Sequence, residues 1–543
     1  MDKINIIREE LEKVYGEISP FEFKNQLINL AKGQKRKSSR TLLDAGRGNP
    51  NWTAATPREA FFTFGQFAIS ECRRVWSKDS LAGMPHKGGI TNRLAKYITK
   101  NNDAPGVELI RKLINYAAIE LSFNVDDFVY ELTDGIIGDN YPFPDRILPH
   151  VEKVIHDYLI SILNYKEQNG KFNIFAVEGA TAAMCYIFNS LKENYLLNKG
   201  DKIAIMTPVF TPYLEIPILP TYDLQVIKIN ANELSKDGKH TWQYPISELE
   251  KLKDKSIKAL FVVNPSNPPS VAISDECTNE LINIINTYNP NLMIISDDVY
   301  GTFVDNFKSL VASFPYNSIG VYSFSKYFGV TGWRLGTIAI NENNIFDKLL
   351  RDLPLDKKQS LDKRYSDLSI NPYNIPFIDR IVADSRQVAL NHTAGLSTPQ
   401  QIQMAFFSIF DLIDKNKDYR NLTKSICRRR QKLLFKGLGL KLDNNPYDAS
   451  YYTEFDLLEW AKDNYGKDFA IYLEKNSKPV DILFKLAKES SIVLLSGGGF
   501  SGPEWSIRIS LANLNDDAYS KIGSILRKIL NQYFLSWKEI NHI

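Results

Sequence analysis

Cysteine and histidine are scarce in this sequence. Among 543 residues there are six histidines and four cysteines, and the cysteines are Cys72, Cys185, Cys277 and Cys427. No two cysteines form a Cys-x-x-Cys pair, which excludes a zinc ribbon and argues against a disulfide framework, so a reducing compartment fits. The histidines form no cluster with the spacing of metal ligands, so we predict no metal site.

The sequence also has little net charge and no long apolar run. Its formal net charge is +3, which implies no nucleic-acid or membrane partner. The basic run Lys35–Arg40 is typical of a solvated loop, because no aromatic or basic residues follow it in groove-reading order. No apolar segment is long enough to span a bilayer, and the start Met1–Asn5 lacks the apolar core of a secretory signal. We therefore expect a cytoplasmic protein.

The chain has enough residues for two domains. Its composition is 44% hydrophobic and 24% charged, which is ordinary for a globular protein. Residues 2–32 predict an amphipathic helix, with Ile7, Leu11 and Val14 at helical spacing. Residues 56–165 are mostly helical patterns broken by glycine and proline clusters.

From about residue 170, short β-branched runs alternate with helical stretches. The runs are 173–177, 202–206, 224–229, 259–263, 292–296, 320–323 and 335–340. Such alternation predicts an α/β fold with a largely parallel sheet covered by helices on both faces. The later pattern predicts a surface insertion over 344–390, a long helix over 418–438, and a smaller α+β domain with strands near 451–456, 491–495 and 506–510.

Polar segments follow four of the predicted strands. They are Glu178–Thr181, Asn264–Pro269, Asp297–Tyr300 and Ser323–Gly336. In parallel sheets, ligands bind beyond the carboxyl ends of the strands, so we expect these segments to form one site.

The segment Ser323–Gly336 has three glycines and two cations. The amine of Lys326 can bond covalently to an aldehyde cofactor, while nearby hydroxyls and the guanidinium of Arg334 can hold a phosphate. The turn Gly179–Thr181 opens a helix expected over 182–191, and a helix N-terminus suits a phosphate. Taken alone, that turn is equally consistent with a simple helix cap.

The pattern Ser323-x-Ser-Lys-x-x-Gly-x-x-Gly-x-Arg334 resembles the signature of fold-type-I aminotransferases, the pyridoxal 5′-phosphate (PLP) enzymes related to aspartate aminotransferase. The resemblance implies an α/β large domain with a mostly parallel sheet sandwiched by helices, plus a smaller α+β domain. It divides the chain into residues 1–55 (an N-terminal arm and the first part of the small domain), 56–415 (the large PLP-binding domain, with the insertion at about 344–390) and 416–543 (the C-terminal small domain).

The same resemblance implies residues that hold the PLP phosphate and carry the aldehyde. Lys326 is the catalytic residue, which binds the cofactor and moves protons. The predicted phosphate-binding residues are Gly179, Ala180, Thr181, Ser323, Ser325 and Arg334. Tyr141 matches a tyrosine that is donated across a dimer interface to the phosphate of the neighbouring subunit, which implies a homo-oligomer of at least two chains.

The PLP ring has its own implied partners. Asp297, in the pattern Asp-x-x-Tyr300, matches the aspartate that keeps the pyridine nitrogen protonated and so makes the ring an electron sink. Asp298 is adjacent, and the sequence leaves a swap between the two open. Tyr300 and Asn267 match the groups that hydrogen-bond the phenolic oxygen. Phe210 falls where the family stacks an aromatic ring, with an ordinary core phenylalanine as the alternative.

The resemblance also implies residues that bind substrate. Arg508 resembles the small-domain arginine that grips the α-carboxylate, since a bidentate guanidinium suits a carboxylate. Its alternative is a surface strand arginine. Arg47 and Gly48 lie in a turn where the family closes a loop over substrate, and Arg47 is either a carboxylate ligand or a surface charge. Asn267 is also predicted to face the substrate.

Four segments in combination resemble aspartate 4-decarboxylases within this family. They are Gly46–Trp52, Asn140–Arg146, Thr211–Pro217 and Ser296–Phe303. Those enzymes convert L-aspartate to L-alanine and CO₂ with aspartate aminotransferase side activity, and they assemble into dodecamers. The substrates implied are L-aspartate and 2-oxo acids.

One departure bears on the activity. Aspartate aminotransferases clamp the side-chain carboxylate of the substrate with an arginine from the partner subunit, and the corresponding loop Leu390–Pro399 has none. A tight ion pair would stabilise a departing carboxylate and raise the barrier to its loss as CO₂, so the absence fits a decarboxylase. It equally fits another specificity, and the alternative is an ordinary class I or II aminotransferase that uses aspartate or another amino acid with 2-oxoglutarate. A non-enzymatic regulator is disfavoured, because residues 1–40 are too short for a DNA-binding helix-turn-helix.

Overall fold

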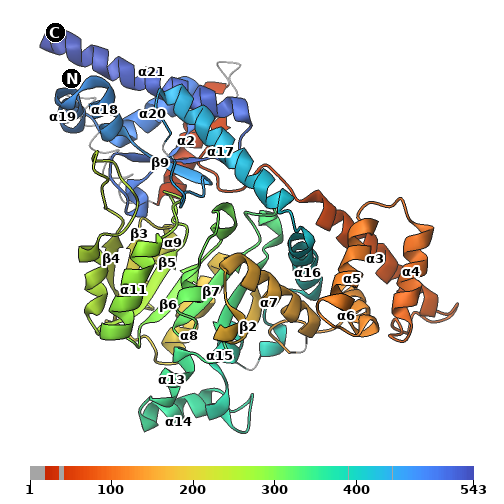
Figure 1. Cartoon of the computed structure of the whole chain (residues 1–543). Coiled ribbons are helices and arrows are strands. Elements are labelled where there is room, and N and C mark those ends of the chain that lie inside the picture. Colours follow the sequence, from red (N-terminus) through yellow and green to blue (C-terminus); the bar gives the residue numbers. More distant parts are fainter. Residues whose placement is uncertain (1–18, 36–41, 143, 389, 443, 543) are drawn as a thin grey trace.

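The computed structural model of the chain describes residues 19–35, 42–142, 144–388, 390–442 and 444–542. Figure 1 shows a large body built on a central sheet, a smaller body above it, and a group of helices beside the large body. The first described helix is α2 (Pro20–Lys35). The residues that carried the expected N-terminal pattern (Ile7, Leu11, Val14) and the basic positions 36–40 lie outside the described residues.

Seven strands form the central sheet, and all seven predicted strands are confirmed with slightly shifted ends. They are β2 (Phe172–Val177), β3 (Lys202–Thr207), β4 (Gln225–Asn230), β5 (Ile257–Val263), β6 (Met293–Asp297), β7 (Ser318–Ser323) and β8 (Gly336–Asn341). Their order is β2-β8-β7-β6-β5-β3-β4. Strand β8 runs antiparallel to both neighbours, and the other adjacent pairs are parallel. The expected largely parallel sheet is confirmed.

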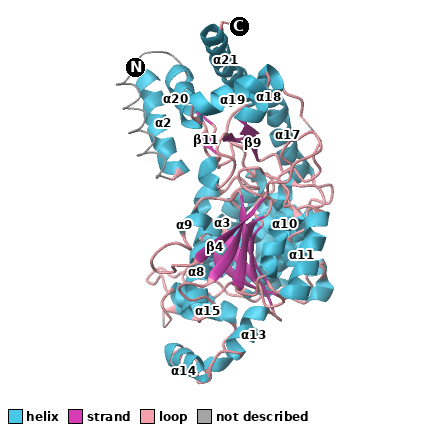
Figure 2. Ribbon diagram, turned by 90° about the vertical axis from the view of Figure 1, so that its left-hand side faces the viewer, coloured by secondary structure: helices cyan, strands magenta, loops and turns pink. Residues whose placement is uncertain are grey.

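Helices cover both faces of this sheet (Figure 2). Those that follow the sheet strands are α8 (Ala180–Glu193), α9 (Pro212–Glu215), α10 (Ile246–Leu249), α11 (Asp275–Tyr288) and α12 (Leu310–Ser313). Because successive side chains along a strand point to opposite sides, each strand places apolar side chains on both faces of the sheet. On one face, Phe261 stacks on Phe188 of α8 with ring centroids 4.4 Å apart. On the other, Leu260 packs in a cluster with Leu281 and Ile285 of α11.

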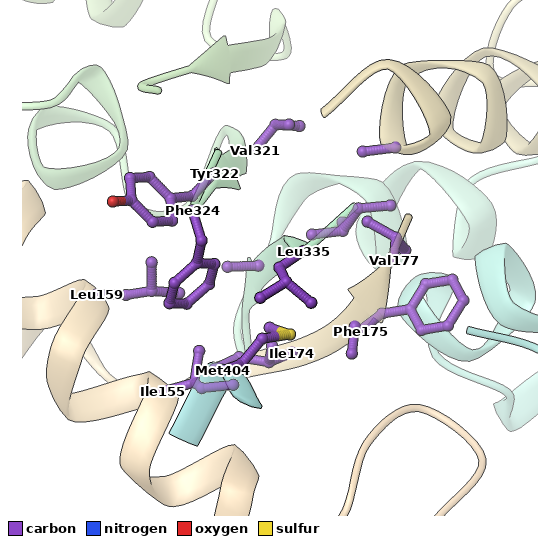
Figure 3. Close-up of a cluster of buried hydrophobic side chains, with 14 of the residues drawn as sticks. Ile155, Leu159, Ile174, Phe175, Val177, Val321, Tyr322, Phe324, Leu335 and Met404 are labelled. Carbon is purple, nitrogen blue, oxygen red and sulfur yellow. The ribbon is translucent and has the colours of Figure 1, made fainter. Parts of the chain in front are cut away.

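Two more helices close the edge of the sheet near β2. They are α7 (Pro149–Leu163) and α16 (Thr398–Ile413). In Figure 3, Ile155 of α7 meets Ile174 of β2 and Met404 of α16, and all three are fully buried. Burying side chains of this size contributes about 1.5–3 kcal/mol each. This apolar layer anchors the sheet whose upper edge carries the site.

The predicted helical region ahead of the sheet is confirmed. Its helices are α3 (Ala55–Val75), α4 (Ile90–Lys100), α5 (Val107–Ile119) and α6 (Val125–Ile137). Helices α3, α5 and α6 pack on one another and on α16. They form the group of helices seen beside the large body in Figure 1.

The segment expected to be a surface insertion is only partly exposed. Its helices are α13 (Ile345–Arg351), α14 (Leu355–Arg364) and α15 (Phe377–Ser385). Leu355 and Ile370 are exposed, but Phe346 and Phe377 are buried and stack with their centroids 5.2 Å apart. The expectation of a surface segment is therefore wrong for α13 and α15, because their apolar sides join the core.

The small body has a core of its own. It contains α17 (Asp418–Leu438), β9 (Tyr452–Asp456), α18 (Leu457–Tyr465), α19 (Lys467–Asn476), α20 (Pro479–Ser490), β10 (Ile492–Val493), β11 (Leu495–Ser496), β12 (Ser506–Ser510) and α21 (Asp516–Asn541). Helix α2 and strand β1 (Leu43–Asp44) join it, since Phe23 and Leu27 enter its core and β1 pairs with β10. The domain boundaries at residues 55 and 415 stay predictions. None of the described helices is both long and apolar enough to cross a membrane.

Candidate active site

One cavity of about 470 Å³ lies between the carboxyl edge of the sheet and the small body. Every site residue predicted from the sequence lines it, with the single exception of Tyr141. The sheet side, which we call the floor, comprises Gly179, Ala180, Thr181, Asn267, Asp297, Tyr300, Ser323, Ser325, Lys326 and Arg334. The opposite side, which we call the wall, comprises Lys24, Arg47, Gly48, Tyr452 and Arg508. Phe21, Phe210 and Tyr213 also line the cavity.

One corner of the floor has the character of a phosphate site. The N-cap of α8 is Gly179, and none of the described side chains caps this helix end, so its backbone N–H groups are available to an anion. The guanidinium of Arg334 donates to the carbonyl of Glu178 over 3.3 Å, which places its charge at the same corner. A Cβ on Gly336 would lie 2.6 Å from the Cα of Gly179, so only glycine permits this approach of β8.

The two adjacent aspartates at the end of β6 have different surroundings. Asp297 lines the cavity and accepts a 2.5 Å hydrogen bond from the hydroxyl of Tyr213. Asp298 instead accepts hydrogen bonds from Ser296 and Ser309 over 2.9 Å and 2.6 Å. Burial raises the pKa of Asp297 to about 6 and that of Asp298 to about 7. Of the two carboxylates, Asp297 is the one that faces the cavity, where a bound cation would favour its ionised form.

Arg508 is the most deeply buried cation of the wall. It is 1% exposed, and it donates to the side-chain oxygen of Asn267 over 3.2 Å and to the carbonyl of Gly46 over 2.7 Å. Its buried Nε has no hydrogen-bond partner among the described residues. A buried guanidinium without a paired carboxylate needs an anion, so this position suits a substrate carboxylate. The alternative of a surface strand arginine is wrong.

Lys326 meets the wall at Gly48. Its Nζ donates to the carbonyl of Gly48 over 3.0 Å, and the same carbonyl accepts from the hydroxyl of Tyr451 over 2.8 Å. The hydroxyl of Tyr452 lies 3.1 Å from that of Tyr300. The amine is therefore held in the cavity beside two phenols, within reach of a molecule that contacts both floor and wall.

Two further cations lie in the wall. Arg47 is largely exposed, and its Nε lies 3.4 Å from a carboxylate oxygen of Asp44. Lys24 projects from α2, and partial burial lowers its pKa, with Arg47 and Arg508 contributing in the same direction. The charge of the wall is thus strongly positive, which favours an anionic substrate.

Tyr141 lies apart from the cavity of its own chain. Its side chain is 69% exposed and contacts His392 edge to face, with ring centroids 5.4 Å apart. Its assignment to the site of a neighbouring subunit stays a prediction. In the same region, Arg386 donates to the carbonyl of Thr393 and pairs with Glu178 over 3.3 Å.

The cavity fits PLP on the chemistry of its donor groups. It contains an uncapped helix N-terminus with an arginine for a phosphate, a primary amine for an aldehyde, and a buried carboxylate for a pyridinium nitrogen. The described residues contain no group of three or more histidine, cysteine, aspartate or glutamate side chains that could hold a metal.

Comparison with known proteins places this site in a family. The model described as "Aminotransferase class I and II" matches residues 140–522. The chain belongs to the class I and II aminotransferases. PLP is therefore its cofactor.

Relatives and solved structures agree with the assignment to class I and II aminotransferases. A Pseudomonas protein named "Bifunctional aspartate aminotransferase and L-aspartate beta-decarboxylase" is 44% identical over 531 residues, which cover 96% of this chain and 98% of the relative. The structure of a Thermus thermophilus aspartate aminotransferase double mutant aligns with a TM-score of 0.57 and 14% identity, over 94% of this chain and 96% of that one. The Rhizobium meliloti aspartate aminotransferase aligns with a TM-score of 0.57 and 16% identity, over 94% and 95%. These structures show that the chain has the aspartate aminotransferase fold.

Sequence reasoning missed several residues that line the cavity of this aminotransferase. Tyr213 follows β3 within the Thr-Pro-Tyr segment, which was noted for its resemblance but not for a hydrogen bond to Asp297. Tyr452 begins β9, where strand alternation alone leaves the facing side open. Phe21 and Lys24 lie on α2, and nothing in that helical pattern marks a site.

Proposed function

We propose that this enzyme converts L-aspartate to L-alanine and CO₂, with aspartate aminotransferase activity on the side. The observation that carries the proposal is the 44% identity to the bifunctional Pseudomonas enzyme over nearly the whole of both chains. The cavity supports it, because a buried guanidinium and two further cations face an amine-bearing floor, and this arrangement suits a dicarboxylic amino acid.

When bound, PLP supplies an electron sink that accepts electrons released at the carbons of the substrate. Lys326 anchors the cofactor and then moves a proton at Cα as a general base. Asp297 holds a proton at the pyridine nitrogen, and Tyr213 fixes the orientation of that carboxylate through its 2.5 Å hydrogen bond. Arg508 binds the α-carboxylate and so orients the bonds around Cα.

The absence of an arginine that could clamp the β-carboxylate supports its departure as CO₂. Loop 390–399 has no arginine, and the guanidinium of Arg386 nearby pairs with Glu178. A loosely held carboxylate is less stabilised in the ground state than one in a bidentate clamp, and neutral CO₂ gains nothing from a cation. The exposed Arg47 attracts the anionic substrate without enclosing it.

The deciding experiment incubates the PLP-loaded enzyme with L-aspartate and no 2-oxo acid, then measures CO₂ and alanine. We expect the two products in equal amounts over many turnovers. Lys326→Ala is the control, and we expect it to lose turnover and the visible absorption of the lysine-bound cofactor. If amino transfer occurs only when 2-oxoglutarate is added, and no CO₂ forms, the enzyme is an ordinary aminotransferase and the proposal fails.

We further propose that the enzyme works as a homo-oligomer of at least two chains. The exposed position of Tyr141 supports this, since it leaves the hydroxyl outside its own cavity. The dodecamer expected from the resemblance is the larger assembly to test. Light scattering gives the molar mass, and Tyr141→Phe is expected to weaken PLP binding if the phenol reaches the phosphate of the partner. A fully active monomer would contradict the proposal.

A further inference from the structure

Decarboxylation at Cβ requires a proton donor besides Lys326, which moves the proton at Cα. Aspartate carries one net negative charge at neutral pH and alanine carries none, so loss of CO₂ is accompanied by uptake of one proton at Cβ. Lys326 handles the proton at Cα. A second acid close to Lys326 and Arg508 is therefore a candidate for the group that donates a proton to Cβ.

Tyr452 lies between those two residues. Its side chain is 2% exposed and lines the cavity, and the guanidinium carbon of Arg508 is 4.4 Å from the centre of its ring. The hydroxyl of Tyr452 and Nζ of Lys326 both approach Gly48. A methyl group added to this glycine would lie 2.5 Å from the hydroxyl and 3.2 Å from Nζ. An amino acid with its carboxylate on Arg508 and its Cα near Lys326 therefore passes beside this phenol.

The charged and polar groups around Tyr452 favour release of its proton. Burial alone pushes the pKa of Tyr452 upward, but the cations of Lys326 and Arg508 and the hydrogen bond with Tyr300 outweigh burial, so the pKa lies below its usual value of 10.0. The pKa of Tyr300 is raised well above that value by burial and by its tyrosine neighbours, and its hydroxyl lies 3.1 Å from that of Tyr452. An acid with a lowered pKa transfers its proton more readily near neutral pH.

We propose that Tyr452 is the general acid that protonates Cβ after CO₂ has left, an inference that rests on the proposed function. The bond between Cβ and the carboxylate carbon breaks, CO₂ departs, and the electron pair stays with the substrate. A new C–H bond forms at Cβ with the proton from the hydroxyl of Tyr452. The phenolate regains a proton from solvent, which accounts for the one proton consumed in each turnover.

Two neighbouring acids are less suitable for this proton transfer, because neither lines the cavity. Glu454 of β9 pairs directly with Arg508 of β12, but it does not line the cavity, and its carboxyl accepts a hydrogen bond from the hydroxyl of Ser506 over 2.6 Å. Tyr451 donates to the carbonyl of Gly48 and also lies outside the cavity lining. Tyr451 therefore offers a matched control. It is an adjacent buried tyrosine, but it does not line the cavity.

The first test compares wild type, Tyr452→Phe and Tyr451→Phe in two reactions of the PLP-loaded enzyme. We expect Tyr452→Phe to lower alanine formation from aspartate about 10²-fold or more, the usual contribution of a general acid. Its amino transfer to 2-oxoglutarate needs no proton at Cβ and should fall much less, whereas Tyr451→Phe should keep the ratio of the two rates. An unchanged ratio in Tyr452→Phe, or equal loss of both reactions, overturns the proposal.

The second test does not depend on turnover. Tyrosine ionisation of the full chain without PLP is followed by its ultraviolet absorbance against pH, in wild type and in both variants. We expect the wild-type curve minus the Tyr452→Phe curve to show one phenol that ionises below the usual value of about 10. A difference phenol that ionises at or above that value overturns the proposal. Absence of CO₂ from the wild type would instead reject the proposed function.

Discussion

The floor and the wall of the cavity are built from different parts of the chain. The floor comes from turns that follow strands β2, β5, β6 and β7 of one sheet, so its residues are fixed by one continuous hydrogen-bonded scaffold. The wall joins the N-terminal segment to the small body through long-range contacts, such as the hydrogen bond from Arg508 to Gly46. The floor carries the groups that suit the cofactor, and the wall carries the cations that suit the carboxylates of a substrate.

The largest effect is expected in the floor, from Asp297→Asn. This change removes the buried charge opposite the pyridine position, and we expect the rate of alanine formation to fall about 10²- to 10³-fold, as for other preorganised electrostatic groups. Asp298→Asn is the matched control, since its partners Ser296 and Ser309 lie away from the cavity lining.

The measurements are initial rates of alanine formation and urea unfolding for both variants. We expect Asp298→Asn to keep most of its activity and to lose about 1–3 kcal/mol of unfolding free energy, because two buried hydrogen bonds must rearrange. If Asp298→Asn is the more damaging change for the rate, the assignment of the two carboxyl groups is reversed.

In the wall, Arg508→Lys is expected to lower kcat/KM for aspartate about 10²-fold. A lysine cannot make the bidentate contact of a guanidinium, and changing one partner of a buried charge pair costs about 2–5 kcal/mol. Arg47→Lys is the exposed counterpart and should have a much smaller effect, since its charge is in contact with solvent. Steady-state kinetics check this, and equal losses in the two variants would contradict the distinction between buried and exposed cations.

This difference between floor and wall also decides how much could be predicted from the sequence. Asp297, Asn267 and Lys326 each follow a predicted strand, and the carboxyl ends of parallel strands meet at one edge, so their convergence was predictable. The wall depends on how two bodies pack, which no local pattern encodes. Arg508 was predicted only through the resemblance, and Lys24 was not predicted at all.

The sequence pattern predicted the strands of the sheet but not the burial of every helix. The seven strands were predicted from their β-branched runs, because each is short and bounded by polar turns. The insertion was misjudged at α13 and α15, because its many charged residues suggested exposure, whereas Phe346 and Phe377 are buried, and so are Arg380 and Asp384 of α15. The sequence of a segment shows which residue types it contains. Burial also depends on which side of the helix packs against the core.

The pH dependence of stability would test the protonation state of Glu454, which pairs with Arg508 of the wall. Burial raises the pKa of Glu454 from 4.5 to about 8, with Asp456 acting in the same direction and Ser506 and Arg508 opposing it. Folding therefore favours the protonated acid, and the stability that it contributes is complete below pH 4.5 and lost as the pH rises toward 8.

The change that isolates this group is Glu454→Gln. In the chain without PLP, the unfolding free energy of wild type relative to the variant should fall by up to about 1.4 kcal/mol per pH unit between these two values. Urea unfolding at several pH values measures the slope, and parallel curves for the two proteins would show that Glu454 is ionised in the folded state. Asp297 and Asp298 titrate in both proteins, so their contributions cancel.

The smallest effect is expected where floor and wall touch, from Gly48→Ala. The added methyl group would lie 2.5 Å from the hydroxyl of Tyr452 and 3.2 Å from Nζ of Lys326, and overpacking of this kind costs about 1–3 kcal/mol. Removing that hydroxyl in the double variant with Tyr452→Phe should recover part of the loss. Unfolding free energies of the two single variants and the double variant give the coupling. Strict additivity would mean that the loop of Gly48 moves away from Tyr452, and the wall would then be more adaptable than the floor.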